Sequence, residues 1–206
     1  WQPDFSSGAS VTRAVEYAGE LFRAEPWARS MSLTVNDGFG YSENDVLRAQ
    51  RRQDGALSMS PLYYTFVAAV AREVAKQHPG KKVAFLPYLW VQEPPAKPLP
   101  ANTMAFLFNE PVKEWQAWRG KVQHFGIYQW LYGWTYVFPN HWPHAMQDYL
   151  RWAREHGVVA FKGESYAAWA VDGPKLFVLN NLLWDPDQDV EALLKDYYVH
   201  AFGAAS

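Results

Sequence analysis

The sequence predicts an α/β fold in which parallel strands and helical crossovers form part of a barrel. Short apolar runs alternate along the chain with longer segments of helical periodicity, an order typical of a parallel sheet. Several apolar runs end in carboxylate, amide or aromatic residues, as barrel strands do at the face that carries their chemistry. The clearest case is residues 32–38, where an apolar strand stops at Asn36-Asp37-Gly38.

Five segments are predicted to form strands. Each runs from apolar residues to a polar or aromatic end, and the first stops at the Asn-Asp-Gly turn. The predicted strands are residues 31–35, 82–90, 103–108, 122–130 and 158–162.

Apolar residues at helical spacing predict the helices between and after these strands. Ser10 is the expected N-cap of a first helix over residues 10–24. Ser60 is expected to cap a second helix, with Pro61 at its first position, that stops at His78. The further predicted helices are residues 112–119, 143–156, 174–184 and 187–202.

Two segments lack such periodicity. The polar stretch around Arg48, Arg51 and Arg52 is expected to lie on the surface. Residues 92–100 are rich in proline, so they are too stiff to form a helix and are expected to form a rim loop.

The number of strand-helix units decides between two parallel architectures. A doubly wound sheet would carry a Gly-rich phosphate turn after its first strand, and neither G-x-G-x-x-G nor a Walker sequence occurs. About five units correspond to part of a TIM (β/α)8-type barrel, whose typical size of about 250 residues exceeds the 206 residues present. We therefore expect a partial TIM (β/α)8-type barrel: one domain over residues 1–206, the C-terminal part of a longer chain whose missing N-terminal part completes the barrel.

Composition excludes several classes of function. The net charge is −2 with scattered Lys and Arg, which argues against a nucleic-acid partner. No cysteine is present, so disulfides and thiolate metal sites are excluded. Apolar runs stop well short of the roughly 20 residues of a membrane span. No metal or other cofactor is expected, because His141 and His144 lack a third ligand at a suitable spacing.

Asp37 and Glu164 are the candidate catalytic residues, since each follows an apolar strand near a glycine. Asp37 could instead form an Asx-turn with backbone N–H groups. Glu164 could pair with Lys162 or begin a helix. Glu110, after Asn109, is a weaker candidate because Pro111 follows at once.

Two carboxylates on different strands are what glycoside hydrolysis requires, one to protonate the leaving oxygen and one to stabilise or attack the anomeric centre. In the substrate-assisted variant, one carboxylate orients the acetamido group of the sugar and the other acts as acid and base. Asp37 or Glu164 could fill either role.

Aromatic residues are abundant, with 11 Trp and 12 Tyr, and their rings can stack on the apolar faces of sugars. About half of those at strand ends should face the helices, because side chains alternate along a strand. The candidate substrate-binding residues are Asn36, Tyr41, Tyr88, Trp90, Tyr128, Trp130 and Trp134.

Four segments together resemble the family called domain of unknown function 4838 (DUF4838). They are S-L-T-V-N-D-G at 32–38, K-K-V-A-F-L-P-Y at 81–88, G-V-V-A-F-K-G-E at 157–164 and L-L-W-D-P-D at 182–187. Some members of that family are endo-β-N-acetylglucosaminidases of glycoside hydrolase family 163, with barrels similar to those of β-hexosaminidases and α-glucuronidases. The resemblance implies a bacterial, secreted or periplasmic glycosidase-like barrel.

These observations lead to one main hypothesis and two alternatives. The main one is a glycoside hydrolase acting on a glycan that contains N-acetylglucosamine or a related sugar. Asn36 and Tyr88 would position the substrate, and Trp130 and Trp134 would form its platforms. The first alternative is a non-catalytic carbohydrate-binding barrel domain, and the second is a purely structural fragment whose exposed sheet edge pairs with other chains.

Overall fold

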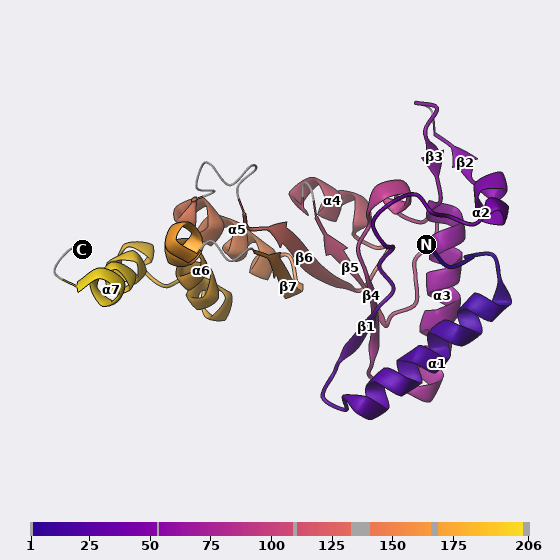
Figure 1. The fold of residues 1–206 in the computed structure, drawn as a ribbon, viewed down its shortest axis with the longest axis horizontal. Coiled ribbons are helices and arrows are strands. Elements are labelled where there is room, and N and C mark those ends of the chain that lie inside the picture. The colour runs from indigo at the N-terminus through magenta and orange to yellow at the C-terminus, as the bar shows by residue number, and fades with distance from the viewer. Residues whose placement is uncertain (1, 53, 109–110, 133–140, 166–168, 204–206) are drawn as a thin grey trace. The chain divides into compact units, whose positions relative to one another are not determined.

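The computed structural model describes residues 2–52, 54–108, 111–132, 141–165 and 169–203. The chain divides into two compact units, Trp1–Tyr128 and Gln129–Ser206. Each is described by itself below, with elements labelled as in Figure 1.

The main sheet has five strands whose order follows the chain, β1-β4-β5-β6-β7. The pairs β1–β4, β4–β5 and β5–β6 are all parallel. A doubly wound sheet would reverse its order beside the first strand, whereas an unreversed parallel order is consistent with a partial barrel. The strands are β1 (Ser30–Ser32), β4 (Lys82–Phe85), β5 (Thr103–Leu107), β6 (His124–Trp130) and β7 (Val158–Glu164).

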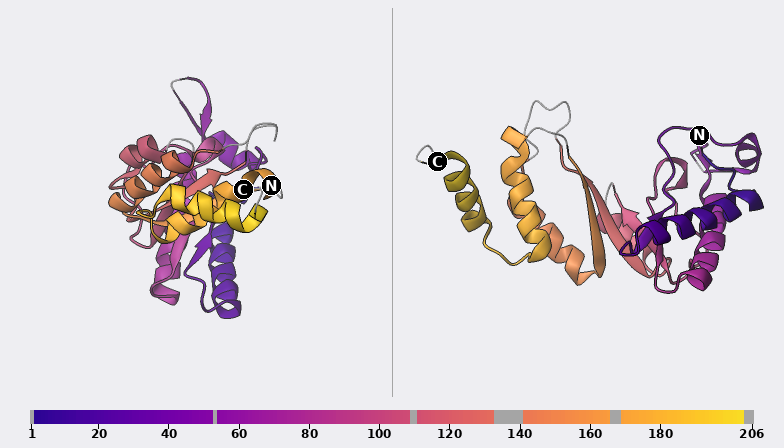
Figure 2. Two further views of the ribbon diagram at one scale, coloured as in Figure 1. Left: turned by 90° about the vertical axis from the view of Figure 1, so that its left-hand side faces the viewer. Right: turned by 60° about the horizontal axis from the view of Figure 1, so that its bottom comes forward.

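Two helices of the first unit, α1 (Gly8–Ala24) and α3 (Ser60–Gln77), pack side by side (Figures 1 and 2). The inner face of α3 buries Tyr63 and Tyr64 completely or nearly so. Tyr64 meets Phe85 of β4 at a ring-centroid distance of 5.3 Å and Trp118 at 5.3 Å. Trp118 ends α4 (Pro111–Trp118), so this aromatic core joins two helices to the sheet.

The segment between β1 and α3 contains more structure than its sequence predicts. A short helix, α2 (Glu43–Arg48), is followed by a hairpin of β2 (Gln50–Arg51) and β3 (Leu57–Ser58). Asp45 in α2 is fully buried, and its carboxylate accepts hydrogen bonds from Phe5 N at 2.8 Å and Ser6 N at 3.2 Å. Arg48, Arg51 and Arg52, which were expected on the surface, are exposed, and the buried side of α2 is tied to the N-terminal segment through Asp45.

Both predicted helix caps in the first unit are wrong. Ser7, not Ser10, caps α1, because its extended backbone lets Oγ accept from Ala9 N. The N-cap of α3 is Met59, which makes no side-chain capping bond, and Ser60 already lies in the first turn beside Pro61.

Two predicted strands end several residues earlier than expected. Strand β4 ends at Phe85, because Pro87 has no N–H for a ladder bond and Leu89–Val91 form the 3₁₀ turn η1. Strand β1 covers only Ser30–Ser32. Beyond it, however, Leu33 N donates to Ala84 O at 2.8 Å and Leu86 N donates to Thr34 Oγ1 at 3.1 Å, so the two segments remain hydrogen-bonded almost up to the Asn-Asp-Gly turn.

The described residues of the second unit contain the end of β6, the strand β7 and three helices, α5 (Pro143–Glu155), α6 (Trp169–Trp184) and α7 (Val190–Phe202). Leu131, Met146, Leu150, Leu179 and Leu182 form the centre of its buried core. Among the described residues, no helix is sufficiently long and apolar to cross a bilayer.

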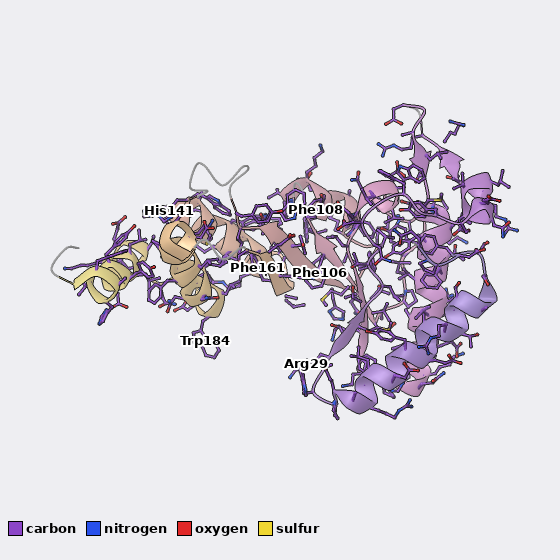
Figure 3. The ribbon with its side chains drawn as sticks, in the orientation of Figure 1. Arg29, Phe106, Phe108, His141, Phe161 and Trp184 are labelled. Atoms are coloured by element: carbon purple, nitrogen blue, oxygen red, sulfur yellow. The ribbon has the colours of Figure 1, made fainter. Side chains whose placement is uncertain are left out.

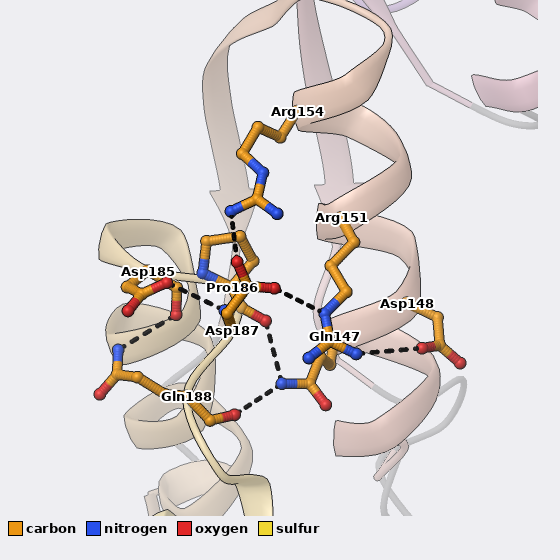
Figure 4. Close-up of polar contacts among 8 residues, drawn as sticks. All are labelled: Gln147, Asp148, Arg151, Arg154, Asp185, Pro186, Asp187 and Gln188. Atoms are coloured by element: carbon orange, nitrogen blue, oxygen red, sulfur yellow. Dashed lines mark hydrogen bonds and ion pairs between the residues drawn. The ribbon is translucent and has the colours of Figure 1, made fainter.

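Polar contacts fasten α5 to the segment between α6 and α7 (Figure 4). Gln147 Nε2 donates to Pro186 O at 2.9 Å and to Gln188 O at 2.6 Å. The Asp187 carboxylate binds Arg151 at 3.0 Å and Arg154 at 2.8 Å, and the two guanidinium groups lower the pKa of Asp187. The W-D-P-D sequence at 184–187 therefore helps to bind the connection between α6 and α7 to helix α5.

Candidate functional site

Three aromatic rings form a row across neighbouring strands of the first unit. Tyr88 follows β4, Phe108 follows β5 and Tyr128 lies in β6. The Phe108 ring, labelled in Figure 3, meets Tyr88 edge-on at 5.5 Å and Tyr128 at 6.0 Å. Phe108 is buried and the two tyrosines are half-buried, so the predicted residues Tyr88 and Tyr128 flank one apolar ring near the carboxyl edge of the sheet.

The turn after β1 holds its carboxylate in solvent. The side-chain amide of Gln2 makes two hydrogen bonds with the backbone of Asn36. It donates to the carbonyl of Asn36 at 2.6 Å and accepts from its N–H at 3.0 Å. Gly38 takes a φ of 98°, which a residue with a side chain adopts only with strain. Asp37 is exposed, and its carboxylate makes no hydrogen bond or ion pair with the residues that the structure describes. The alternative of an Asx-turn requires such a bond, so the geometry favours an available carboxylate.

Tyr41 and Trp90 stack on each other, with ring centroids 5.1 Å apart and planes inclined by 10°. Tyr41 is only 7% exposed, and this burial raises the pKa of its phenol to about 12. Phe39, 59% exposed, touches Trp90 at 4.9 Å. Tyr41 therefore supports one face of the Trp90 ring, and the exposed neighbour of Trp90 is Phe39, which the sequence did not single out.

Glu164 ends β7 in the second unit, where its carbonyl accepts a hydrogen bond from Leu131 N at 2.8 Å and its side chain is half-buried. Trp130 is 41% exposed and lies 6.4 Å from the Tyr132 ring. Trp134, Asn109 and Glu110 lie outside the described residues. Since Asp37 belongs to the first unit and Glu164 to the second, convergence of the two carboxylates stays a prediction.

A buried ion pair in the second unit was not predicted. Lys175 Nζ donates to Asp172 Oδ1 at 2.8 Å and also to the carbonyl of Leu131, and the two side chains are 1% and 7% exposed. Burial, and then the charge of Lys175, lower the pKa of His141, whose position Figure 3 labels. The D-x-x-K spacing at 172–175 places both groups on one helix face and could have signalled the pair. Among the described residues, no three His, Cys, Asp or Glu side chains gather as a metal site would need.

A cavity of about 1030 Å³ lies in the first unit, between the β2–β3 hairpin, α3 and the proline-rich loop. Its lining includes neither Asp37 nor any of the aromatic residues predicted to bind substrate. The predicted rim loop does border a cavity, but one formed with the hairpin. Asp54-Gly55 is a turn sequence typical of hairpins, and it is the signal by which the sequence could have located this wall.

The fold and the strand-end side chains define an α/β chain with a partial-barrel sheet and aromatic residues along its carboxyl edge. The chain belongs to the DUF4838 family, described as a domain of unknown function, whose sequence profile matches residues 1–206. The resemblance noted from residues 32–38 onward is thereby confirmed, and it extends to the N-terminal helix as well. No curated protein matches the chain.

Proposed function

We propose that the chain is part of a TIM (β/α)8-type barrel, related to glycoside hydrolase family 163, that hydrolyses a glycan containing N-acetylglucosamine or a related sugar. The observation that carries the proposal is the row Tyr88, Phe108 and Tyr128 on neighbouring parallel strands, near the same edge as the exposed carboxylate of Asp37. Glycosidases combine flat apolar rings with carboxylates in this way, because the rings hold the sugar while the carboxylates act on the glycosidic bond.

In this proposal Glu164 and Asp37 are the acid/base and the acetamido-orienting carboxylate, in either assignment. Asn36, held by Gln2, and Tyr88 position the sugar. Trp130, which is 41% exposed, and Trp134 provide platforms. A secreted or periplasmic bacterial protein with a glycan substrate fits these roles.

A non-catalytic carbohydrate-binding domain is the second candidate. The cavity of about 1030 Å³ in the first unit is lined by neither proposed catalytic carboxylate, and this observation favours binding without hydrolysis. At the strand ends of such a domain, the aromatic residues would hold a glycan and the carboxylates would only accept hydrogen bonds from its hydroxyl groups. The cavity, which these residues do not line, would be a separate binding place.

Kinetics on an aryl N-acetylglucosaminide separate the two candidates. For the hydrolase, Asp37→Asn and Glu164→Gln should each lower kcat by on the order of 10²–10⁴-fold. The matched control is Glu155→Gln, because Glu155 is an exposed carboxylate at the end of α5, and it should keep the wild-type rate. Glycan binding without turnover in any version would establish the binding domain. Turnover that survives both substitutions would overturn the two assignments.

A further inference from the structure

The cavity of the first unit has the size and walls of a ligand site. Its volume of about 1030 Å³ is at the upper end of the range typical of small-molecule pockets. Pro94, Pro95 and Pro98 form one wall, and proline rings give this wall a fixed backbone and an apolar surface. No residue of this cavity takes part in the proposed hydrolysis.

Cationic side chains outnumber acidic ones in the lining. This excess is local, because the chain as a whole carries a net charge of −2. Four cationic and two acidic residues contribute to the walls: Arg51, Arg52, Arg72 and Lys97 against Asp54 and Glu93.

A single arginine engages both acids. Arg52 Nε lies 3.0 Å from a Glu93 oxygen and 3.4 Å from an Asp54 oxygen. Ser58 Oγ also donates to Glu93. The two carboxylates therefore share one guanidinium group, and the lining as a whole, with four cations and two acids, keeps a net charge of +2.

The other three cations have no acidic partner among the residues that the structure describes. Arg51 donates to the carbonyl of Gly55 at 3.3 Å, a contact that leaves its charge uncompensated. Arg72 projects from α3, and Lys97 from the proline-rich loop, without an ion pair to any described residue. These charges favour an anion in the cavity.

Ser60 supplies an independent indication of a ligand. This residue is 3% exposed and lines the cavity. Its Oγ is buried and has no hydrogen-bond partner among the described residues. A buried hydroxyl without a partner costs free energy that a bound polar group would recover.

We propose that this cavity binds an acidic sugar, a monosaccharide unit that carries a sulfate or a carboxylate. Arg72, Lys97 and Arg51 contact the anion, the Ser60 hydroxyl bonds a sugar hydroxyl, and the proline wall packs against the apolar face of the ring. The inference rests on the proposed function only for the sugar part of the ligand. Binding needs no turnover, so the assay succeeds or fails independently of hydrolysis.

Calorimetric titration of the chain with matched ligands tests this proposal. N-acetylglucosamine 6-sulfate is compared with N-acetylglucosamine, and glucuronate with glucose, so that each pair differs in the anionic group. At least one acidic member should bind about tenfold more tightly than its neutral partner, and added salt should weaken the binding because it screens charge. Whichever pair shows the difference identifies the source of the anion. Equal affinity within both pairs, no binding of any ligand, or equally tight binding of inorganic sulfate would overturn the proposal.

Two variants locate the binding to this cavity. Arg72→Gln should lower the affinity for the acidic ligand by roughly tenfold, as expected for the loss of a charge-assisted hydrogen bond. Lys76→Gln is the matched control, because Lys76 lies one turn further along α3, exposed and outside the lining. Ser60→Ala should weaken binding and leave the melting temperature unchanged or higher, since its Oγ has no partner to lose. Undiminished affinity in Arg72→Gln and Ser60→Ala would refute the assignment.

Discussion

Burial controls the ionisation of three phenols in the first unit. Desolvation raises the pKa of Tyr41 to about 12 and raises those of Tyr63 and Tyr64 well above the ordinary value. A phenolate in this core would lose its hydration without gaining a cationic partner, and the neutral form is therefore favoured. In the unfolded chain the same phenols ionise near pH 10.

This difference predicts an alkaline loss of stability. The folded-state pKa of Tyr41 lies above the unfolded value, so its contribution is fully present below about pH 10 and is lost as the pH rises towards 12. The free energy of unfolding should fall by about 1.4 kcal/mol per pH unit for each such phenol in this range. Urea unfolding between pH 8 and about pH 11 measures the slope. Tyr41→Phe removes one of the titrating phenols and should therefore make the slope of the free energy of unfolding against pH shallower by about 1.4 kcal/mol per pH unit. A slope identical to that of the wild type would contradict the argument.

Residues that depend on local chemistry were predictable, and residues that depend on distant partners were not. The turn at Asn36-Asp37-Gly38 follows from its own sequence, because Gly38 takes the positive φ that glycine accepts without strain. The hydrogen bonds between Gln2 and the backbone of Asn36 join residues that are 34 positions apart in the sequence, and no local pattern encodes them. Burial of Tyr41 likewise depends on packing against Trp90, which places Tyr41 beneath a candidate platform.

At the scale of elements, long periodic segments were predictable and short ones were not. Helix α5 was predicted over 143–156 and spans Pro143–Glu155, because its apolar residues recur at helical spacing. The strands β2 and β3 have two residues each, too few for any period to show. Their hairpin nevertheless forms a wall of the cavity. Because strands this short leave no periodic pattern, the cavity was not predicted from the sequence.

Lys175 pairs with Asp172 within α6 and donates to the carbonyl of Leu131, the residue after β6, and these contacts yield the second prediction. Lys175→Met leaves the Asp172 carboxylate buried without its partner and the Leu131 carbonyl without its donor. We expect a loss of about 3–5 kcal/mol in the free energy of unfolding, as for other broken buried pairs. Denaturant unfolding with circular dichroism measures it.

A double variant and a surface variant complete that experiment. Lys175→Met with Asp172→Leu removes both charges and should recover most of the loss, since buried pairs can be replaced by apolar residues of similar size. Lys195→Met changes an exposed lysine of α7 and should cost no more than about 0.5 kcal/mol. A Lys175→Met variant as stable as the control would show that the pair does not hold α6 in place.

At the scale of the molecule, the order of the strands was the most predictable feature. Strands that alternate with helices imply parallel neighbours, and the order β1-β4-β5-β6-β7 agrees. The division into Trp1–Tyr128 and Gln129–Ser206 has no counterpart in composition, because no linker-like sequence separates the two units. The expectation of a single domain stays a prediction.

The same strand order leaves β7 at one end of the described sheet, next to β6 alone. Unpaired backbone groups on an edge strand can pair with another chain, particularly where apolar side chains accompany them. Val159 in β7 is 65% exposed, and a lysine at such a position opposes edge pairing. We therefore expect the wild-type chain to self-associate as its concentration rises. The Val159→Lys variant should associate less and therefore show a lower mean molecular mass in solution at the same concentration. Light scattering after size exclusion gives this mass, with Val112→Lys as the control because Val112 is 47% exposed and belongs to helix α4 instead of a strand. A wild-type chain that stays monomeric throughout, or equal association in Val159→Lys and wild type, would show that β7 is not a pairing edge.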